Sequence, residues 1–241
     1  MASAGEVVTQ EQMPEDEVED VLATALLPMF VPRFLYKSVR PPERIYYRVY
    51  KRGGEYAVFL LYYWHFQSFP PHVDDYAPVI VFIDRDERGM HRVREVYTDV
   101  GHYAVGGFKN SLGFGRMWLV VMGPWRAMVA RSPQESQDGL VQIYPYDDVA
   151  GRRVRVELVP LTDEVLRELR SKKVNPINIS DRILRDPWSI RGASTWSVYG
   201  PWTPKSLVVD ILKNYGLARL PSGEEEAEAA AACLLYTSDA A

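Results

Sequence analysis

The sequence predicts an α+β fold, mainly antiparallel β in a β-sandwich or a strongly curved sheet, with terminal helices packed on it. Two observations support this fold class. Between residues 44 and 159, apolar or alternating segments of strand length follow one another at close spacing, separated by glycine and polar turn residues. Segments with helical spacing of apolar residues lie only before and after this region. Many short neighbouring strands are typical of antiparallel sheets.

The first predicted hairpin shows two kinds of strand. Residues 45–50 alternate between two faces, a Gly-Gly pair supplies a turn, and residues 56–66 return as a nearly uninterrupted apolar run. Half-exposed strands alternate, whereas strands that are buried on both faces carry continuous apolar runs. Residues 57–64 and 79–83 are therefore expected to be central, buried strands.

The remaining strands extend the same sheet structure. A charged turn after residue 84 leads into a strand expected at 92–97. Further strands are expected at 117–122, 125–130 and 140–144. Residues 152–159 alternate between apolar and charged side chains, which predicts a strand with one buried face.

Helices are predicted at both ends of the strand region. They are expected at 17–27, 162–172, 180–186 and 203–215. Pro28 ends the first, because proline cannot continue a helix. Thr162 is the predicted N-cap of the second. Pro204 in the first turn and Gly216 just beyond the end bracket the last.

We expect one folded domain with charged or artefactual ends. Its parts are an acidic disordered N-terminus at 1–15, an N-terminal helix and Pro-rich linker at 16–43, an antiparallel β domain at 44–159, a helical C-terminal part of the same domain at 160–220, and a disordered or artefactual tail at 221–241. Ordering a residue costs roughly 1–2 kcal/mol, and the two ends offer little apolar surface to offset it. Residues 1–15 and 223–241 are therefore expected to contribute nothing to stability.

The last nine residues have an unusual sequence. Cys-Leu-Leu-Tyr-Thr-Ser-Asp-Ala-Ala at 233–241 resembles the translation of an adapter used to prepare DNA sequencing libraries. The chain is therefore expected to come from a metagenomic assembly with a truncated C-terminus. Cys233 is the one cysteine of the sequence. Without it, disulfides, thiolate zinc sites and a cysteine nucleophile are excluded for the rest of the chain.

Charge differs between the ends and the body of the chain. The sequence has 28 Lys and Arg against 32 Asp and Glu, but twelve of the acids lie in residues 1–20 and 223–241, which hold no base. Residues 21–222 therefore carry a net charge of +8. A basic body suits a small anionic ligand, and an Arg-rich solvated surface is the alternative. No aromatic–basic recognition motif is present, so nucleic acid is an unlikely partner.

No targeting or transmembrane segment is expected. The first apolar run, at residues 21–27, follows acidic rather than basic residues and is too short to cross a bilayer. A soluble, intracellular protein with a cytoplasmic location is therefore expected.

A candidate polar site lies between the two central strands. His65 is followed by two prolines and then by His72, Asp74 and Asp75. If the prolines hold this segment as a loop, these side chains could converge on Mg, Ca or Mn, with His65 or His102 completing the coordination. In a strand, Asp75 would lie on the opposite face from Asp74. The alternative is that the two Asp residues cap a turn and His65 is structural.

The segment resembles a known family motif. The motif Gly-His-Arg-His-Asp-Trp-Glu belongs to the β-sandwich family of necrosis- and ethylene-inducing-peptide-like proteins and the related vacuolar-sorting-protein-62-type domains. In the matching segment, the first His falls on His72, the Asp on Asp75 and the Trp on Tyr76. His102 corresponds to the downstream His. The resemblance covers about residues 44–130 and implies a β-sandwich with a divalent-metal site.

Two positions depart from the family motif. Its Glu, a metal ligand in the family, is Ala77 here, and its second His is Asp74. The resemblance therefore implies a degenerate site, unless Asp74 replaces the lost carboxylate. The plant-toxin activity of the family is not implied.

The favoured function is a non-catalytic binding module for a small anionic or sugar-like ligand. Its candidate residues are His72, Asp74, Asp75, Tyr76, His102 and His65, of which His72, Asp75 and Asp74 are the possible metal ligands. The alternative is a divalent-metal-dependent hydrolase that uses the same loop, with His102 moving protons. The sequence contains no Gly-x-Ser-x-Gly elbow, phosphate loop or dinucleotide fingerprint to support other chemistry.

Overall fold

The structure is a computed structural model. It describes residues 6–36, 39–68, 71–100, 104–110, 115–122, 127–145, 148–149, 152–153, 155–172 and 177–197. None of the helices in these ranges has the length and apolar character needed to cross a bilayer.

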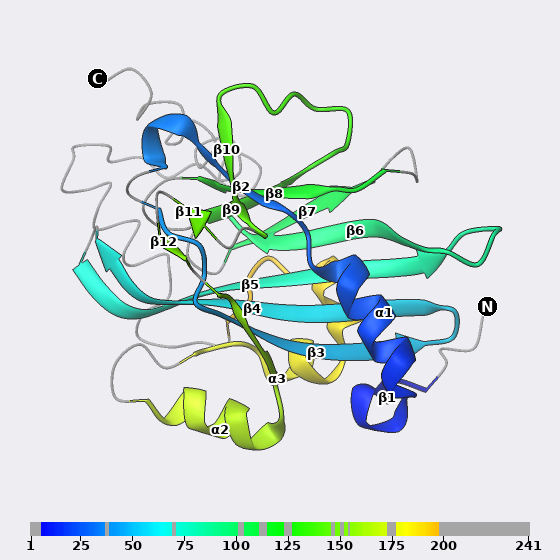
Figure 1. The fold of residues 1–241 in the computed structure, drawn as a ribbon. Coiled ribbons are helices and arrows are strands. Elements are labelled where there is room, and N and C mark those ends of the chain that lie inside the picture. The colour runs from blue at the N-terminus through cyan, green and yellow to red at the C-terminus, as the bar shows by residue number, and fades with distance from the viewer. Residues whose placement is uncertain are drawn as a thin grey trace.

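The larger of the two main sheets has seven strands (Figure 1). Its strands are β1 (Val8–Thr9), β3 (Arg44–Arg52), β4 (Glu55–Ser68), β5 (Pro71–Arg85), β6 (His91–Asp99), β7 (Val105–Lys109) and β13 (Glu157–Pro160). The order is β1-β3-β4-β5-β6-β7, and β13 joins β3 in parallel. All other neighbours in this sheet are antiparallel.

A smaller sheet packs on one face of the larger one. It consists of β10 (Leu140–Tyr144), β2 (Met29–Pro32), β8 (Trp118–Met122) and β9 (Ala127–Arg131) in that order. A separate ribbon pairs β11 (Asp148–Val149) with β12 (Arg152–Arg153). Val31 and Leu119 of the smaller sheet share one core with Val58 and Val81 of the larger sheet. The helix α1 (Glu15–Ala25) closes the same core, which makes the fold a β-sandwich with a helix at one end.

Short helices cover the other face of the larger sheet. They are α2 (Asp163–Ser171), α3 (Asp181–Arg185) and the 3-10 helix η3 (Pro187–Gly192). Leu166 and Ile183 from these helices join Phe59 and Phe82 of the sheet in a second core. In Figure 1, α1 lies in front of the larger sheet and α3 behind it. The larger sheet is thus buried on both faces.

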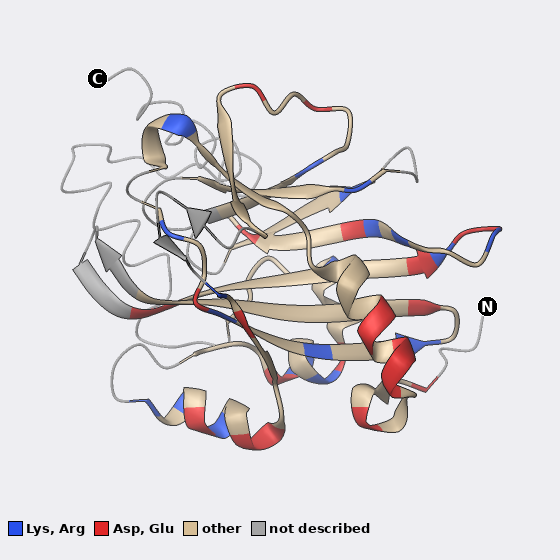
Figure 2. Ribbon diagram, in the orientation of Figure 1, with Lys and Arg blue, Asp and Glu red and all other residues tan. Residues whose placement is uncertain are grey.

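The predicted fold class is confirmed. Residues 57–64 and 79–83 lie in the neighbouring strands β4 and β5, and their members Phe59, Leu60 and Ile80 are fully buried. Figure 2 shows that the centres of these strands carry no charge, whereas acidic residues line α1. The Thr162 hydroxyl caps α2 by accepting a hydrogen bond from the Val165 amide at 3.2 Å. The helix expected at 203–215 and the tail at 221–241 lie outside the described residues.

Some strands differ from expectation. The region 16–43, expected to hold a helix and a linker, also contains β2, because its apolar residues Met29 and Val31 fill the space between the sheets. The strand expected at 152–159 is instead two short strands, and Leu158 is 41% exposed rather than buried. Alternation alone does not show that β13 is an edge strand, which explains this error.

Residues 8–13 make specific contacts with the rest of the fold, whereas disorder was expected for 1–15. Thr9 pairs with Tyr50 in β1–β3, and the Gln10 Oε1 atom accepts a hydrogen bond from the Val49 amide at 3.0 Å. Met13 packs against the core between the sheets. Acidic composition predicted disorder, but these contacts depend on a partner strand that composition does not reveal.

Removing residues 1–13 is therefore expected to destabilise the protein. The deletion breaks the β1 pairing and the Gln10 hydrogen bond and uncovers part of the core. A loss of about 2 kcal/mol, or roughly 4–8 °C in Tm, follows from one hydrogen bond and partial apolar exposure. Thermal unfolding followed by circular dichroism measures this change, with a chain that lacks only residues 1–5 as the control. An unchanged Tm would support the original expectation of a segment without influence.

Candidate functional site

The candidate segment is a strand, not a loop. Residues 71–76 belong to β5, and all of them except Asp74 are in register with β4, so that Asp75 lies opposite Trp64 and His72 opposite Gln67. The loop prediction was wrong because β4 continues to Ser68 and pairs with Pro71, His72, Val73 and Asp75. A proline at the first position of a strand is compatible with such pairing.

The strand separates the two candidate carboxylates. Asp74 contacts Tyr63 on the face that α2 covers. Asp75 is buried and pairs directly with Trp64, whose ring lies in the core between the sheets. Because successive residues of a strand face opposite sides, Asp74 and Asp75 do not converge on one cation.

Two of the other expected site residues cannot be placed in the same way. The side chain of His72 and the whole of His102 lie outside the described part of the structure. Within the described part, no three His, Cys, Asp or Glu side chains are grouped so that they could hold a metal ion.

Asp74 has an unusual backbone conformation. Its φ is 57°, and it is the single non-glycine residue with positive φ among the described residues. The left-handed region is unfavourable for most residues and less so for Asp and Asn. The Tyr63 hydroxyl donates a hydrogen bond to Asp74 Oδ1 at 2.6 Å, and Lys172 Nζ donates to the same oxygen at 3.2 Å. These two contacts hold the carboxylate against the end of α2.

The environment of Asp74 keeps its carboxylate ionised. Partial burial alone would raise the pKa of Asp74, but the hydrogen bonds from Tyr63 and Lys172 outweigh it, so the pKa is lowered. The pKa of Tyr63 is raised, first by burial and then by its hydrogen bond to Asp74. At neutral pH the site therefore holds an ionised Asp74 carboxylate and a neutral Tyr63 phenol.

Aromatic rings surround this ion pair. The ring centroids of Tyr63 and Tyr76 are 5.2 Å apart, and Lys172 Nζ lies 5.2 Å from the first and 5.6 Å from the second. Tyr46 packs edge-on against Tyr63 at 6.3 Å. The Tyr76 hydroxyl is buried and has no hydrogen-bond partner among the described residues. Its pKa is raised by burial and then by the charge of Asp74.

His65 lies at the solvent side of the same site. Its side chain is 65% exposed, and its Nδ1 atom is 3.3 Å from the Tyr63 hydroxyl and 4.0 Å from Asp74 Oδ1. We call the five residues His65, Tyr63, Asp74, Tyr76 and Lys172 the Asp74 cluster. Three of them are predicted from the sequence, and Tyr63 and Lys172 are not. Tyr63 sits two residues before His65 in β4, so the alternation of a strand could have indicated it.

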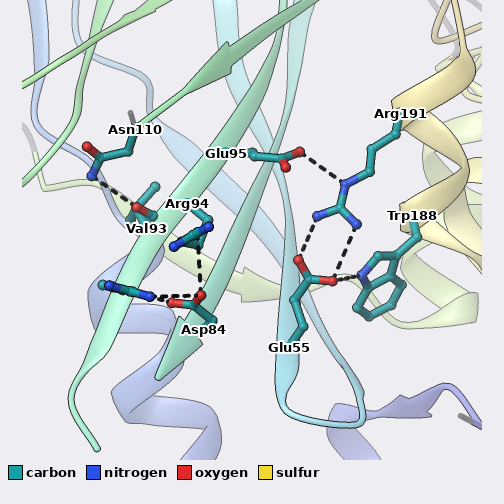
Figure 3. Close-up of polar contacts among 9 residues, drawn as sticks. Glu55, Asp84, Val93, Arg94, Glu95, Asn110, Trp188 and Arg191 are labelled. Atoms are coloured by element: carbon teal, nitrogen blue, oxygen red, sulfur yellow. Dashed lines mark hydrogen bonds and ion pairs between the residues drawn. The ribbon is translucent and has the colours of Figure 1, made fainter. Parts of the chain in front are cut away.

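Two other polar clusters on the larger sheet connect elements of the fold to one another (Figure 3). Arg191 of η3 binds Glu55 at 2.6 Å and Glu95 at 3.0 Å, and the Trp188 indole donates to Glu55. These contacts connect η3 to β4 and β6. A second group, in which Arg92 and Arg94 contact Asp84, lies within the β5–β6 hairpin.

The comparisons with known proteins give a distant structural neighbour and no family. No protein-family model matches the chain, and no curated protein does. Among solved structures, the chain is similar to the crystal structure of the non-toxic HaNLP3 protein, at 15% identity over 65% of this chain and 69% of that one. The TM-score is 0.35, so no argument about function rests on this likeness.

The lowered pKa of Asp74 predicts a pH-dependent stability. A carboxyl group whose pKa is lower in the folded state stabilises the protein above its unfolded pKa, and this contribution is lost as the pH falls through the folded pKa. Asp74→Asn, which keeps the size and tolerates positive φ, is expected to cost about 1–2 kcal/mol at pH 7. Urea unfolding at a series of pH values should show the two proteins converging below about pH 4. A difference that stays constant with pH would contradict the assignment.

Proposed function

We propose that the chain is a non-catalytic binding module and that the Asp74 cluster is its binding site. The observation that carries this proposal is the left-handed backbone of Asp74 within a strand. Such strain costs of order 1–3 kcal/mol and is concentrated at functional sites, where the surrounding structure holds it in place. A buried Tyr76 hydroxyl without a partner among the described residues adds a second unfavourable feature at the same position.

The chemistry of the cluster favours a ligand that donates hydrogen bonds. Both bonds that described residues make to Asp74 end on Oδ1, which leaves Oδ2 to accept from a ligand. The Lys172 ammonium is paired with this carboxylate, so it provides little net attraction for an anion. Of the anionic and sugar-like classes, the hydroxylated, sugar-like ligand therefore fits better, because its hydroxyls can donate to Asp74 and accept from Lys172.

The hydrolase alternative has less support. It needs Asp74 and Asp75 to bind one cation, and the two residues lie on opposite faces of β5. Lys172 already forms an ion pair with Asp74, so a metal ion at this position would have to compete with Lys172.

Calorimetric titration with methyl glucoside, methyl galactoside and methyl mannoside tests the proposal. At least one glycoside is expected to bind with a Kd of about 1 mM, and Asp74→Asn is expected to weaken binding at least tenfold, or about 1.4 kcal/mol. Asp138→Asn, an exposed acid in the loop before β10, is the matched control and should bind as the unchanged protein does. Inorganic phosphate and sulfate are expected to give no heat.

Two results would overturn the proposal. One is that none of the glycosides binds. The other is that binding is equally strong in Asp74→Asn and in the unchanged protein, which would move the site elsewhere. Binding of phosphate or sulfate instead would favour an anionic ligand over a sugar-like one.

A further inference from the structure

The Lys172 side chain contacts the other members of the Asp74 cluster in the way that a ligand would. Lys172 follows the last residue of α2, and its ammonium group lies over both Tyr63 and Tyr76 and beside Asp74. An ammonium within about 6 Å of aromatic rings is attracted to their faces, and cages of this kind recognise organic cations. The side chain is 26% exposed, so its amine lies at the mouth of the site rather than deep in the core.

The charges around this position favour a cation even without Lys172. Asp74 is ionised, and Glu168, which precedes Lys172 by about one helical turn, acts electrostatically on Tyr76. Arg44 also acts electrostatically on Tyr76, but it is bound to Glu157 at 2.6 Å. With Lys172 withdrawn, two tyrosine rings and an ionised carboxylate would therefore remain, with the exposed His65 imidazole 4.0 Å from Asp74 Oδ1 as the nearby described side chain.

We propose that Tyr63, Tyr76 and Asp74 form a binding site for organic ammonium groups, and that Lys172 is its internal occupant. This inference rests on the proposed function of the Asp74 cluster and adds a ligand class and a means of regulation. An external ammonium ligand binds when Lys172 moves aside. The apparent affinity of the unchanged protein is then reduced by the fraction of molecules in which the site is open.

Titration of the unchanged protein and of Lys172→Ala with n-butylammonium at constant ionic strength tests this inference. The probe carries the same carbon chain and amine as a lysine side chain, and 1-butanol is its neutral counterpart. We expect n-butylammonium to bind the unchanged protein and to bind Lys172→Ala about tenfold more tightly, as for a site that is open in about one molecule in ten. Asp74→Asn combined with Lys172→Ala should lose this gain, and 1-butanol should bind neither protein.

Arg167→Ala is the matched control, because Arg167 is an exposed cation of α2 that hydrogen-bonds within its own helix. It should leave the affinity for n-butylammonium unchanged. If n-butylammonium binds Lys172→Ala but not the unchanged protein, the inference is overturned. Such a result would show only that the ligand can fill the cavity left by the mutation. Equal binding of 1-butanol, or no binding to either protein, would overturn it as well.

The glycoside titration separates the two proposals. If glycosides bind in an Asp74-dependent way and n-butylammonium does not, the binding module stands and the ammonium site is wrong. If neither kind of probe binds, both proposals fail.

Discussion

Replacing Trp196 by alanine is expected to lower the free energy of unfolding by about 3–5 kcal/mol. Trp196 is fully buried and packs against Phe59 of β4, with ring centroids 6.5 Å apart. Its indole donates a hydrogen bond to the Thr98 carbonyl at 3.3 Å, and its own carbonyl accepts from the Ser180 amide at 2.8 Å. The residue thus joins the helical layer to the centre of the larger sheet, and its loss leaves a large cavity there.

Urea unfolding of Trp196→Ala measures this loss, with Trp196→Phe as the matched comparison. Phenylalanine keeps most of the apolar contact and removes the hydrogen bond, so its expected cost is smaller, about 1–2 kcal/mol. A loss below about 1 kcal/mol in the alanine variant would be too small for a packed core tryptophan. Such a result would mean that Trp196 does not belong to the second core.

Arg191→Met is also expected to have a large effect, about 2 kcal/mol. The change leaves Glu55 and Glu95 without their shared cation and removes the guanidinium that lies 4.2 Å from the centroid of the Phe82 ring. Removing one partner of a fully buried ion pair costs about 3–5 kcal/mol. The side chains here are 35%, 30% and 21% exposed, and solvent screening reduces that figure.

Two further variants show whether the loss comes from stranded charge. Glu55→Gln and Glu95→Gln, added together to Arg191→Met, should recover part of the stability, because they remove the unpaired carboxylates. Arg131→Met breaks an exposed pair with Glu135 and should cost at most about 0.5 kcal/mol. An Arg191→Met loss no larger than that of Arg131→Met would contradict a supporting role for this network.

Local and strongly patterned features of this fold could be predicted from the sequence. The central strands were identified because uncharged runs such as 57–64 need burial on both faces. The Thr162 cap was identified because capping depends on neighbouring residues alone. The strands β1 and β2 were not predicted, since segments of two and four residues carry no periodicity and depend on distant partners. The extension of β5 to Pro71 was missed because two prolines indicate a loop unless a partner strand is known.

The candidate site shows the same division. His65, Asp74 and Tyr76 were selected because polar residues beside buried strands are where ligands are commonly bound. Lys172 was missed because it meets Asp74 across 98 residues, and that contact depends on how α2 docks on the sheet. Asp75 was grouped with Asp74 on the assumption of a loop. In the strand that forms, it lies toward Trp64 and the core between the sheets.

The most direct test of the binding site is its location on the protein. Nitrogen–proton NMR spectra of the full chain, recorded during a titration with the glycoside that binds best, report which backbone amides change. The binding module proposed here predicts that the largest shifts occur at Tyr63, His65, Asp74, Tyr76 and Lys172, and that Asp74→Asn abolishes them. Shifts concentrated instead in α1 or in the smaller sheet, with the Asp74 cluster unchanged, would contradict the account.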